Sequence, residues 1–118
     1  MQTVEELDVF KLSHETALTI YKITKTFQED ERFSLSSQMR RAAYSIPMNI
    51  AEGAGRLNSG EYRQFAGVAR GSTSELKYPL FLAKDPGYIH PQNYEDLRSN
   101  CERISQMLTA LAKSLTSK

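Results

Sequence analysis

Four basic residues recur at intervals of seven in the second half of the chain: Arg63, Arg70, Lys77 and Lys84. Because seven residues make about two turns of an α-helix, this spacing predicts a basic stripe along one side of a helix. Guanidinium and ammonium groups in such a row bind the phosphates of nucleic acid with little regard to base sequence, and this binding weakens steeply as salt rises. The alternative is that the stripe pairs with acidic side chains, within the chain or between subunits.

The acidic side chains that such pairing requires are concentrated at the start of the chain. The formal net charge is only +1. Residues 1–31 hold three basic and seven acidic side chains, whereas residues 32–60 hold four basic and one acidic side chain. A nearly neutral chain therefore combines an acidic beginning with a basic centre. The arginines of that centre are further candidates for binding phosphate. The candidate phosphate contacts are Arg40, Arg41, Arg56, Arg63, Arg70 and Lys77.

No pattern of catalytic or metal-binding residues accompanies these cations. His14 and His90 each lack a second ligand three or four residues away, so they do not form a zinc pair; we expect His14 to be exposed and His90 to cap a helix. Cys101 lies among apolar residues, which favours a buried thiol over a nucleophile, because a nucleophile needs an accessible, electropositive setting. We therefore predict that the protein is not an enzyme and holds no cofactor and no metal.

The length and composition are those of one ordinary domain, which we assign to residues 1–118. Hydrophobic residues make up 40% of the chain and charged residues 25%. No apolar run approaches the roughly 20 residues that cross a bilayer. The beginning of the chain lacks the cationic start and apolar core of a secretory signal. We therefore expect a soluble, cytoplasmic domain with no membrane partner.

Between the glycine and proline breaks, apolar residues recur at alternating spacings of three and four, which is the pattern of amphipathic helices. The pattern predicts helices over 4–29, 36–57, 60–85 and 91–115. Ser59 is the expected N-cap of the third helix, Pro91 opens the fourth, and the Gly53-Ala54-Gly55 run ends the second. Because the connections are short, the economical all-α architecture is an antiparallel up-down-up-down four-helix bundle.

Pro47 interrupts the second predicted helix. Because proline has no N–H, the carbonyl of Ala43 must find another donor in Ser45, Asn49 or water. One interpretation is a kink that lets the helix wrap around its neighbours. The other is a polar notch, with Asn49 and Glu52 about one turn apart, that contacts a ligand or partner.

The apolar rows that would face the bundle core are thin. They contain Ser13, Thr24 and Thr73 where a monomeric bundle favours leucine or isoleucine, so each helix buries less apolar area. Gly67 and Gly71, one turn apart on an outer face, support close contact between subunits. Further apolar residues outside the rows indicate either a wide apolar stripe on ordinary helices or a second buried surface between subunits, and we favour the oligomer. These residues are Val9, Leu12, Tyr21, Ile23, Tyr44, Phe65, Val68, Tyr78 and Phe81.

Residues 37–56 form a distinctive stretch with the sequence SQMRRAAYSIPMNIAEGAGR. This stretch closely resembles the signature of the bacterial four-helix bundle family known as the 23S rRNA-intervening sequence proteins. The later Gly71-Ser72 and Glu75-Leu76 pairs are similar to that family as well. The residues that match the family motif, to which we assign a structural role, are Ser45, Pro47, Asn49, Glu52, Gly53, Gly71 and Glu75.

This resemblance implies a compact antiparallel bundle that assembles into a homopentamer. It also implies a relationship to the accessory variability determinant of diversity-generating retroelements, a basic pentamer that binds nucleic acid and a reverse transcriptase. The expected partners are therefore further copies of this chain, RNA or DNA, and a protein such as a reverse transcriptase.

Two hypotheses for the function result from these patterns. The first is a non-enzymatic oligomeric bundle that binds nucleic acid or serves as an accessory factor in a ribonucleoprotein; a ring of subunits would repeat the basic stripe and strengthen its field. The second is a protein-interaction scaffold whose basic and acidic faces close the oligomer.

Overall fold

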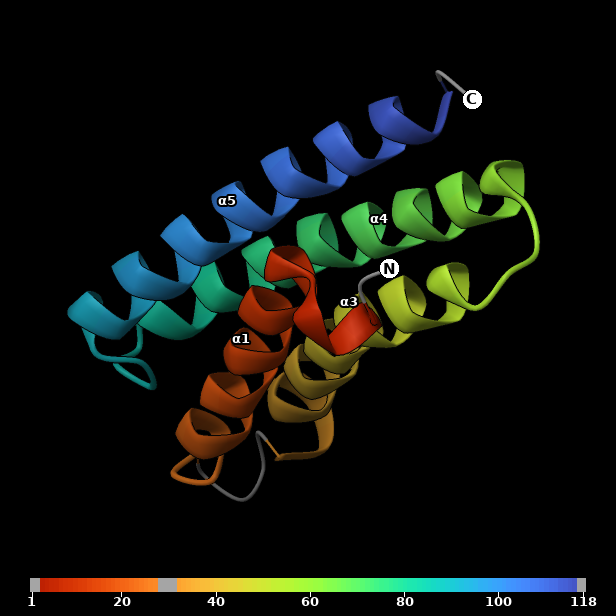
Figure 1. The fold of residues 1–118 in the computed structure, drawn as a ribbon. Coiled ribbons are helices and arrows are strands. Elements are labelled where there is room, and N and C mark those ends of the chain that lie inside the picture. Colours follow the sequence, from red (N-terminus) through yellow and green to blue (C-terminus); the bar gives the residue numbers. More distant parts are fainter. Residues whose placement is uncertain (1–2, 28–31, 117–118) are drawn as a thin grey trace.

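The computed structural model describes residues 3–27 and 32–116, and within these residues the chain is helical and contains no strand. The predicted all-α class is confirmed (Figure 1). The four long helices are α1 (Asp8–Thr24), α3 (Ser37–Ala54), α4 (Ser59–Lys84) and α5 (Pro91–Thr116).

The beginning of the chain differs from the continuous helix predicted over 4–29. A 3-10 turn, η1 (Val4–Glu6), comes first, and Leu7 then adopts an extended conformation with φ −70° and ψ 131°. Because an extended residue cannot continue an α-helix, α1 begins only at Asp8. The helix ends at Thr24, and the last two residues of the predicted range lie outside the described residues. A π-helical segment, η2 (Arg32–Ser36), leads into α3.

The turn between α3 and α4 corrects two predicted helix ends. α3 ends at Ala54, earlier than predicted, and Gly55 is its C-cap, as the glycine-rich run indicated. The N-cap of α4 is Asn58 and not Ser59: Asn58 Oδ1 accepts a hydrogen bond from the backbone N–H of Glu61 at 2.8 Å. Asn58 takes this role because its backbone is extended, whereas Ser59 has already entered the helix.

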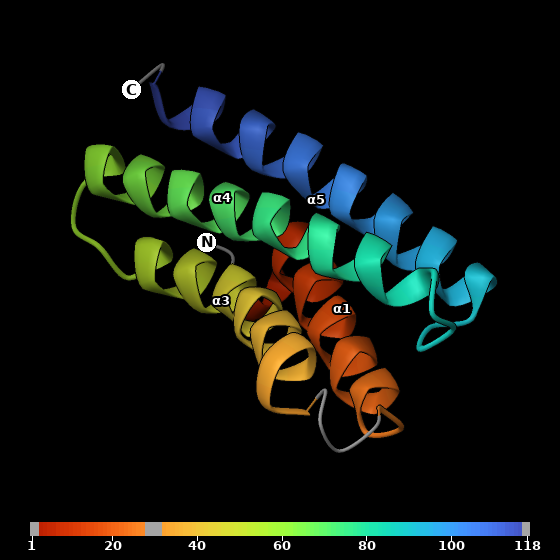
Figure 2. The same ribbon diagram turned by 180° about the vertical axis from the view of Figure 1, so that it is seen from behind.

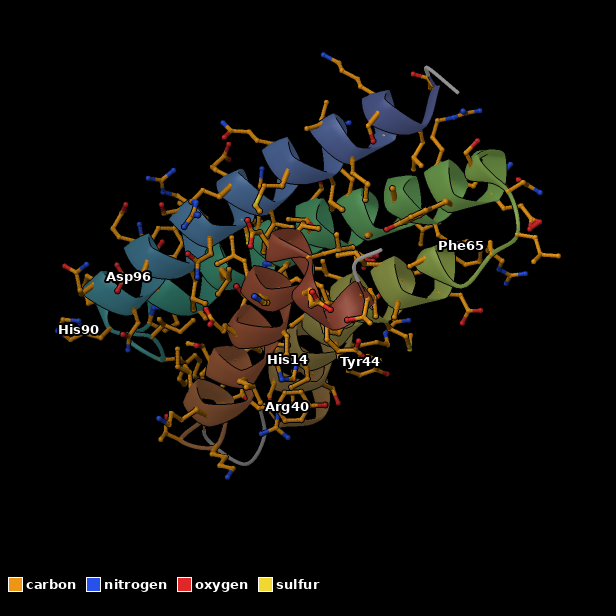
Figure 3. The ribbon with its side chains drawn as sticks, in the orientation of Figure 1. His14, Arg40, Tyr44, Phe65, His90 and Asp96 are labelled. Carbon is orange, nitrogen blue, oxygen red and sulfur yellow. The ribbon has the colours of Figure 1, made fainter. Side chains whose placement is uncertain are left out.

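Both histidines lie where the sequence predicted. α5 begins at Pro91, and His90 Nδ1 accepts a hydrogen bond from the backbone N–H of Gln92 at 3.1 Å, so His90 caps this helix. His14 is exposed on α1, and the two histidines lie on different elements (Figure 3).

Each long helix packs against two others. α3 contacts α1 and α4, and α5 contacts α4 and α1. Figures 1 and 2 both show α4 lying between α3 and α5, which leaves the outer side of α4 without a neighbouring helix in the described part of the chain. The fully buried core includes Ile20, Met39, Ile46, Ile50, Leu76, Leu80, Leu97, Ile104 and Leu108.

The small polar residues expected in the core are buried, and their hydroxyl groups have hydrogen-bond partners. Thr24 Oγ1 donates to the carbonyl of Ile20 at 2.7 Å, and Thr73 Oγ1 donates to the carbonyl of Ala69 at 2.9 Å. Because each partner is a backbone carbonyl one turn earlier in the same helix, these residues enter the core without an unsatisfied donor. The helices therefore approach one another closely where a larger side chain would separate them.

Gly53 is the clearest case of such an approach. A β-carbon at this position would lie 2.8 Å from Cβ of Phe65 and 2.8 Å from Cδ1 of Tyr62, both on α4. Carbon atoms pack best at about 3.5–4.0 Å, so a side chain at Gly53 would push α3 away from α4. At Gly67, in the middle of α4, nothing lies within 4 Å of the equivalent position.

We expect Gly53→Ala to destabilise the protein by about 1–2 kcal/mol. Alanine gains about 1 kcal/mol over glycine inside a helix, but Phe65 and Tyr62 must move to admit the methyl group. The matched control is Gly67→Ala, which should stabilise the protein by about 1 kcal/mol because its methyl group enters open space. Urea unfolding followed by circular dichroism measures both values, and a stabilised Gly53→Ala protein would contradict the close contact.

Candidate nucleic-acid interface

Arg63, Arg70 and Lys77 lie along one side of α4. The side chains of Arg63 and Arg70 are exposed, and neither forms an ion pair within the described residues. Lys77 is half-buried, and its Nζ donates to Glu102 Oε1 on α5 at 3.0 Å. This hydrogen bond, together with the charge of Lys77, lowers the pKa of Glu102. Two of the three cations therefore face solvent with their charge uncompensated by a neighbouring acid.

Lys84, the last residue of the basic stripe, lies over two aromatic rings. Its Nζ is 4.9 Å from the ring centre of Phe81 and 4.7 Å from that of Tyr94. The two rings meet edge to face, with their centres 6.3 Å apart. The faces of aromatic rings attract cations, so these two rings hold the ammonium group of Lys84. The C-terminal part of α4 therefore presents a positive charge next to aromatic side chains.

Arg40 holds α3 to the end of α1 and does not join the α4 cations. Its Nε donates to Thr24 Oγ1 at 2.7 Å, and its Nη2 donates to the backbone carbonyl of Tyr21 at 3.3 Å. The guanidinium also lies 4.7 Å from the centre of the Tyr21 ring. Figure 3 shows Arg40 on α3 far from the start of α4, where Phe65 is labelled. These contacts occupy the guanidinium and give Arg40 a role in the fold.

The other two arginines of the predicted set belong to α3 and the turn after it. Arg56 donates to Glu52 Oε2 at 3.3 Å and lies 4.7 Å from the ring centre of Phe65. The ion pair is exposed, so it holds Arg56 only weakly. Arg41 is exposed on α3. The structure therefore brings together Arg63, Arg70 and Lys77 and leaves Arg40, Arg41 and Arg56 outside that group.

Pairing between the basic stripe and the acidic first helix is not seen within residues 3–27 and 32–116. The acidic residues at positions 29–31 lie outside the described residues, and pairing between subunits stays a prediction. The ion pairs of the described residues are Arg56–Glu52, Lys77–Glu102 and Arg98–Glu95.

The polar side chains near Pro47 link α3 to α4. Asn49 Nδ2 donates to the backbone carbonyl of Ser45 at 2.7 Å and to Ser45 Oγ at 3.0 Å. Ser45 Oγ in turn lies 2.8 Å from Ser72 Oγ on α4, in a hydrogen bond. Asn49 thus donates to the carbonyl of Ser45 and not to that of Ala43, for which it was one of three candidate donors. The remaining motif residues Glu52, Gly71 and Glu75 are exposed.

Three adjoining hollows beside the basic stripe form one groove between α4 and α5, which we call the α4–α5 groove. Their volumes are about 390, 350 and 300 Å³. Ser74 and Lys77 line both the first and the second hollow, and Arg70 lines both the second and the third. The shared residues show that the hollows are neighbours along α4.

Sequence reasoning missed the two cations that α5 contributes to this groove. Arg98 lines the first hollow and Lys113 the third. Their spacing of fifteen residues places them on about the same side of a helix, and this is the signal that was available. The sequence could not show that this side of α5 lies next to the basic stripe of α4.

Cys101 is a buried thiol, as predicted. Burial raises its pKa from 9.0 to about 11, and the nearby charge of Lys77 lowers it only in part. The side chain therefore stays protonated near neutral pH, which does not suit a nucleophile. Within the described residues, no group of three His, Cys, Asp or Glu side chains could hold a metal ion. None of the helices in that part of the chain combines the length and hydropathy needed to cross a membrane.

Comparison with known proteins identifies relatives of this chain. The family model described as "23S rRNA-intervening sequence protein" matches residues 5–110. A solved structure from Bacteroides thetaiotaomicron, described as a protein with unknown function from the S23 ribosomal protein family, is similar with a TM-score of 0.81. It shares 26% sequence identity, and the similarity covers 89% of this chain and 98% of that one. No match was found among curated proteins.

We expect Asn49→Ala to destabilise the protein by about 1–2 kcal/mol, because the half-buried Ser45 carbonyl and hydroxyl lose a shared donor. The control is Gln64→Ala, which removes an exposed amide from α4 and should change the stability by less than about 0.5 kcal/mol. Urea unfolding of the two variants tests this. Equal stabilities would show that the hydrogen bonds from Asn49 to Ser45 do not stabilise the protein.

Proposed function

Because the chain belongs to the 23S rRNA-intervening sequence protein family, we propose that it is a non-enzymatic helical bundle that binds nucleic acid, as an accessory factor of a ribonucleoprotein. The observation that carries this proposal is the exposure of Arg63 and Arg70, which lie beside α5 and have no acidic partner within the described residues. A cation without a neighbouring acid is free to displace the counterions of a phosphate backbone.

The proposal includes the assembly of several chains. One chain presents only a short row of cations and carries a net charge of +1, so its field is weak. In an up-down-up-down antiparallel bundle that forms a homopentamer, every subunit repeats the row, and the local potential rises accordingly. The proposed setting is the cytoplasm, with a protein partner such as a reverse transcriptase.

Exposed apolar side chains on α3 and α4 support the assembly. Met48 and Val68 are 54% and 52% exposed, and Tyr44 and Leu82 are also open to solvent. Tyr44 and Met48 lie one turn apart on the same side of α3, next to Ser45, which contacts α4. These four residues, which we call the apolar face, are the surface that we assign to contact between subunits.

This apolar face also supports the second candidate function, a protein-interaction scaffold. In that case the basic stripe meets the acidic first helix of a neighbouring subunit and closes the oligomer. The two candidates differ in what Arg63 and Arg70 contact: phosphates in the first, and carboxylates of another subunit in the second.

We expect the protein to bind labelled RNA and DNA at about 50 mM salt and to lose affinity in a linear log–log relation as salt rises. The reason is that binding releases counterions from the phosphates that Arg63, Arg70 and their symmetry copies neutralise. Fluorescence anisotropy over a salt series measures the affinity and the slope. Absence of binding at about 50 mM salt would rule out the proposed function.

We expect the double variant Arg63→Glu/Arg70→Glu to lose nucleic-acid binding while keeping its assembly. The matched control, Lys11→Glu/Lys22→Glu, makes the same charge change on exposed positions of α1 and should bind as before. Light scattering after size-exclusion chromatography measures the assembly of both variants. Dissociation of the Arg63→Glu/Arg70→Glu protein, with the control intact, would favour the scaffold instead.

A further inference from the structure

The α4–α5 groove carries a strong excess of positive charge. Among the residues that line it, the cations are Arg63, Arg70, Lys77, Arg98 and Lys113, and the only acid is Glu102. Glu102 already pairs with Lys77, and Arg98 pairs with Glu95 at 3.1 Å. Both ion pairs are exposed, so either cation exchanges its partner for another anion at little cost. The ligand chemistry that this lining favours is a chain of anionic groups.

The cations follow the length of the groove. Arg63 and Arg70 line the third hollow, Arg70 and Lys77 the second, and Lys77 the first. Consecutive members are two turns apart, or about 10 Å along the helix axis. A ligand that meets all three must therefore be extended and carry its charges at intervals, which describes a polymer and excludes a single small anion.

Aromatic side chains stand at one end of the groove, in the first hollow. Tyr78 is 66% exposed and Phe81 is 47% exposed, and both line this hollow. Tyr94 meets Phe81 edge to face and lines the same hollow. Exposed rings beside cations offer flat surfaces on which nucleobases stack, whereas the carboxylate side chains of an acidic polypeptide have no ring to stack there.

The second hollow supplies neutral polar groups between the aromatic end and the arginine end. Ser74 comes from α4, and Ser105, Gln106 and Thr109 come from α5. Hydroxyl and amide groups both donate and accept hydrogen bonds, so they suit the edges of bases and the sugars of a nucleic acid. A purely electrostatic contact with a duplex backbone would not need them.

We infer that the α4–α5 groove binds single-stranded nucleic acid, with phosphates on Arg63, Arg70 and Lys77 and unpaired bases stacked on Tyr78 and Phe81. The inference rests on the proposed function and names its substrate class. Bases in a duplex are already stacked on one another and cannot reach the aromatic end, so a duplex engages the cations alone. The groove lies between α4 and α5, and none of the four residues of the apolar face lines it.

The experiment compares labelled oligouridine with a duplex of the same length by fluorescence anisotropy. We expect the single strand to bind more tightly. Tyr78→Leu/Phe81→Leu should weaken the single strand about tenfold for each ring and leave the duplex and the salt slope unchanged, because no charge is removed. The control Tyr21→Leu removes an exposed tyrosine from α1, outside both the groove and the apolar face, and should bind as the unaltered protein does.

A second variant tests the arginine end of the groove independently of the aromatic end. Arg63→Gln/Arg70→Gln should lower the salt slope for the single strand by about 1.4, because each lost phosphate contact contributes about 0.7. Its preference for single strands over duplex should persist, since both rings remain. Circular dichroism of each variant checks that the helices are intact, and Tyr78→Leu alone, at the more exposed ring, gives the same test with the least effect on packing.

The outcomes distinguish this inference from the proposed function. If the protein binds no nucleic acid, both the inference and the proposed function are wrong. Equal binding of single strand and duplex, or aromatic variants that bind like the control, overturns the inference and leaves the proposed function standing. The inference is also overturned if polyglutamate displaces labelled oligouridine as effectively as unlabelled oligouridine does. An acidic polypeptide would then bind the groove as well as a single-stranded nucleic acid.

Discussion

The close contact between α3 and α4 is the constraint on which the rest of the structure depends. Gly53 removes the side chain that would meet Phe65, and the hydrogen bond between Ser45 and Ser72 joins the same two helices nearer their middles. With α3 on one side and α5 on the other, α4 has a single exposed side. Arg63 and Arg70 border the contact between α4 and α5, so the site of the cations follows from helix packing.

The basic residues of this protein have different roles because the groups that surround them differ. Arg40 meets a hydroxyl, a carbonyl and a ring at the end of α1, and its guanidinium belongs to the fold. Lys77 meets a carboxylate across the contact with α5. Arg63 and Arg70 meet no acid within the described residues and are the ones that can neutralise phosphates. A count of basic residues cannot make this distinction, because all four look alike in the sequence.

A core rich in small residues links the fold to the proposed assembly. Thr24 and Thr73 satisfy their hydroxyls within their own helices, so their burial leaves no unpaired donor, but each buries less apolar surface than leucine. Large apolar side chains such as Met48 and Val68 lie instead on the outside. Burying them between subunits would add the apolar area that the core of one chain lacks.

The sequence by itself determined the all-α class, the residues that match the family motif and most helix ends, because apolar spacing, proline and glycine act locally. It misplaced the start of α1, where Leu7 is extended, and the cap at Asn58, because backbone conformation at a helix end depends on a few competing side chains. Only the tertiary structure decided which cations stay free and which acquire partners. Only the tertiary structure places Arg98 and Lys113 beside the basic stripe, because packing between distant segments decides which side of one helix faces another.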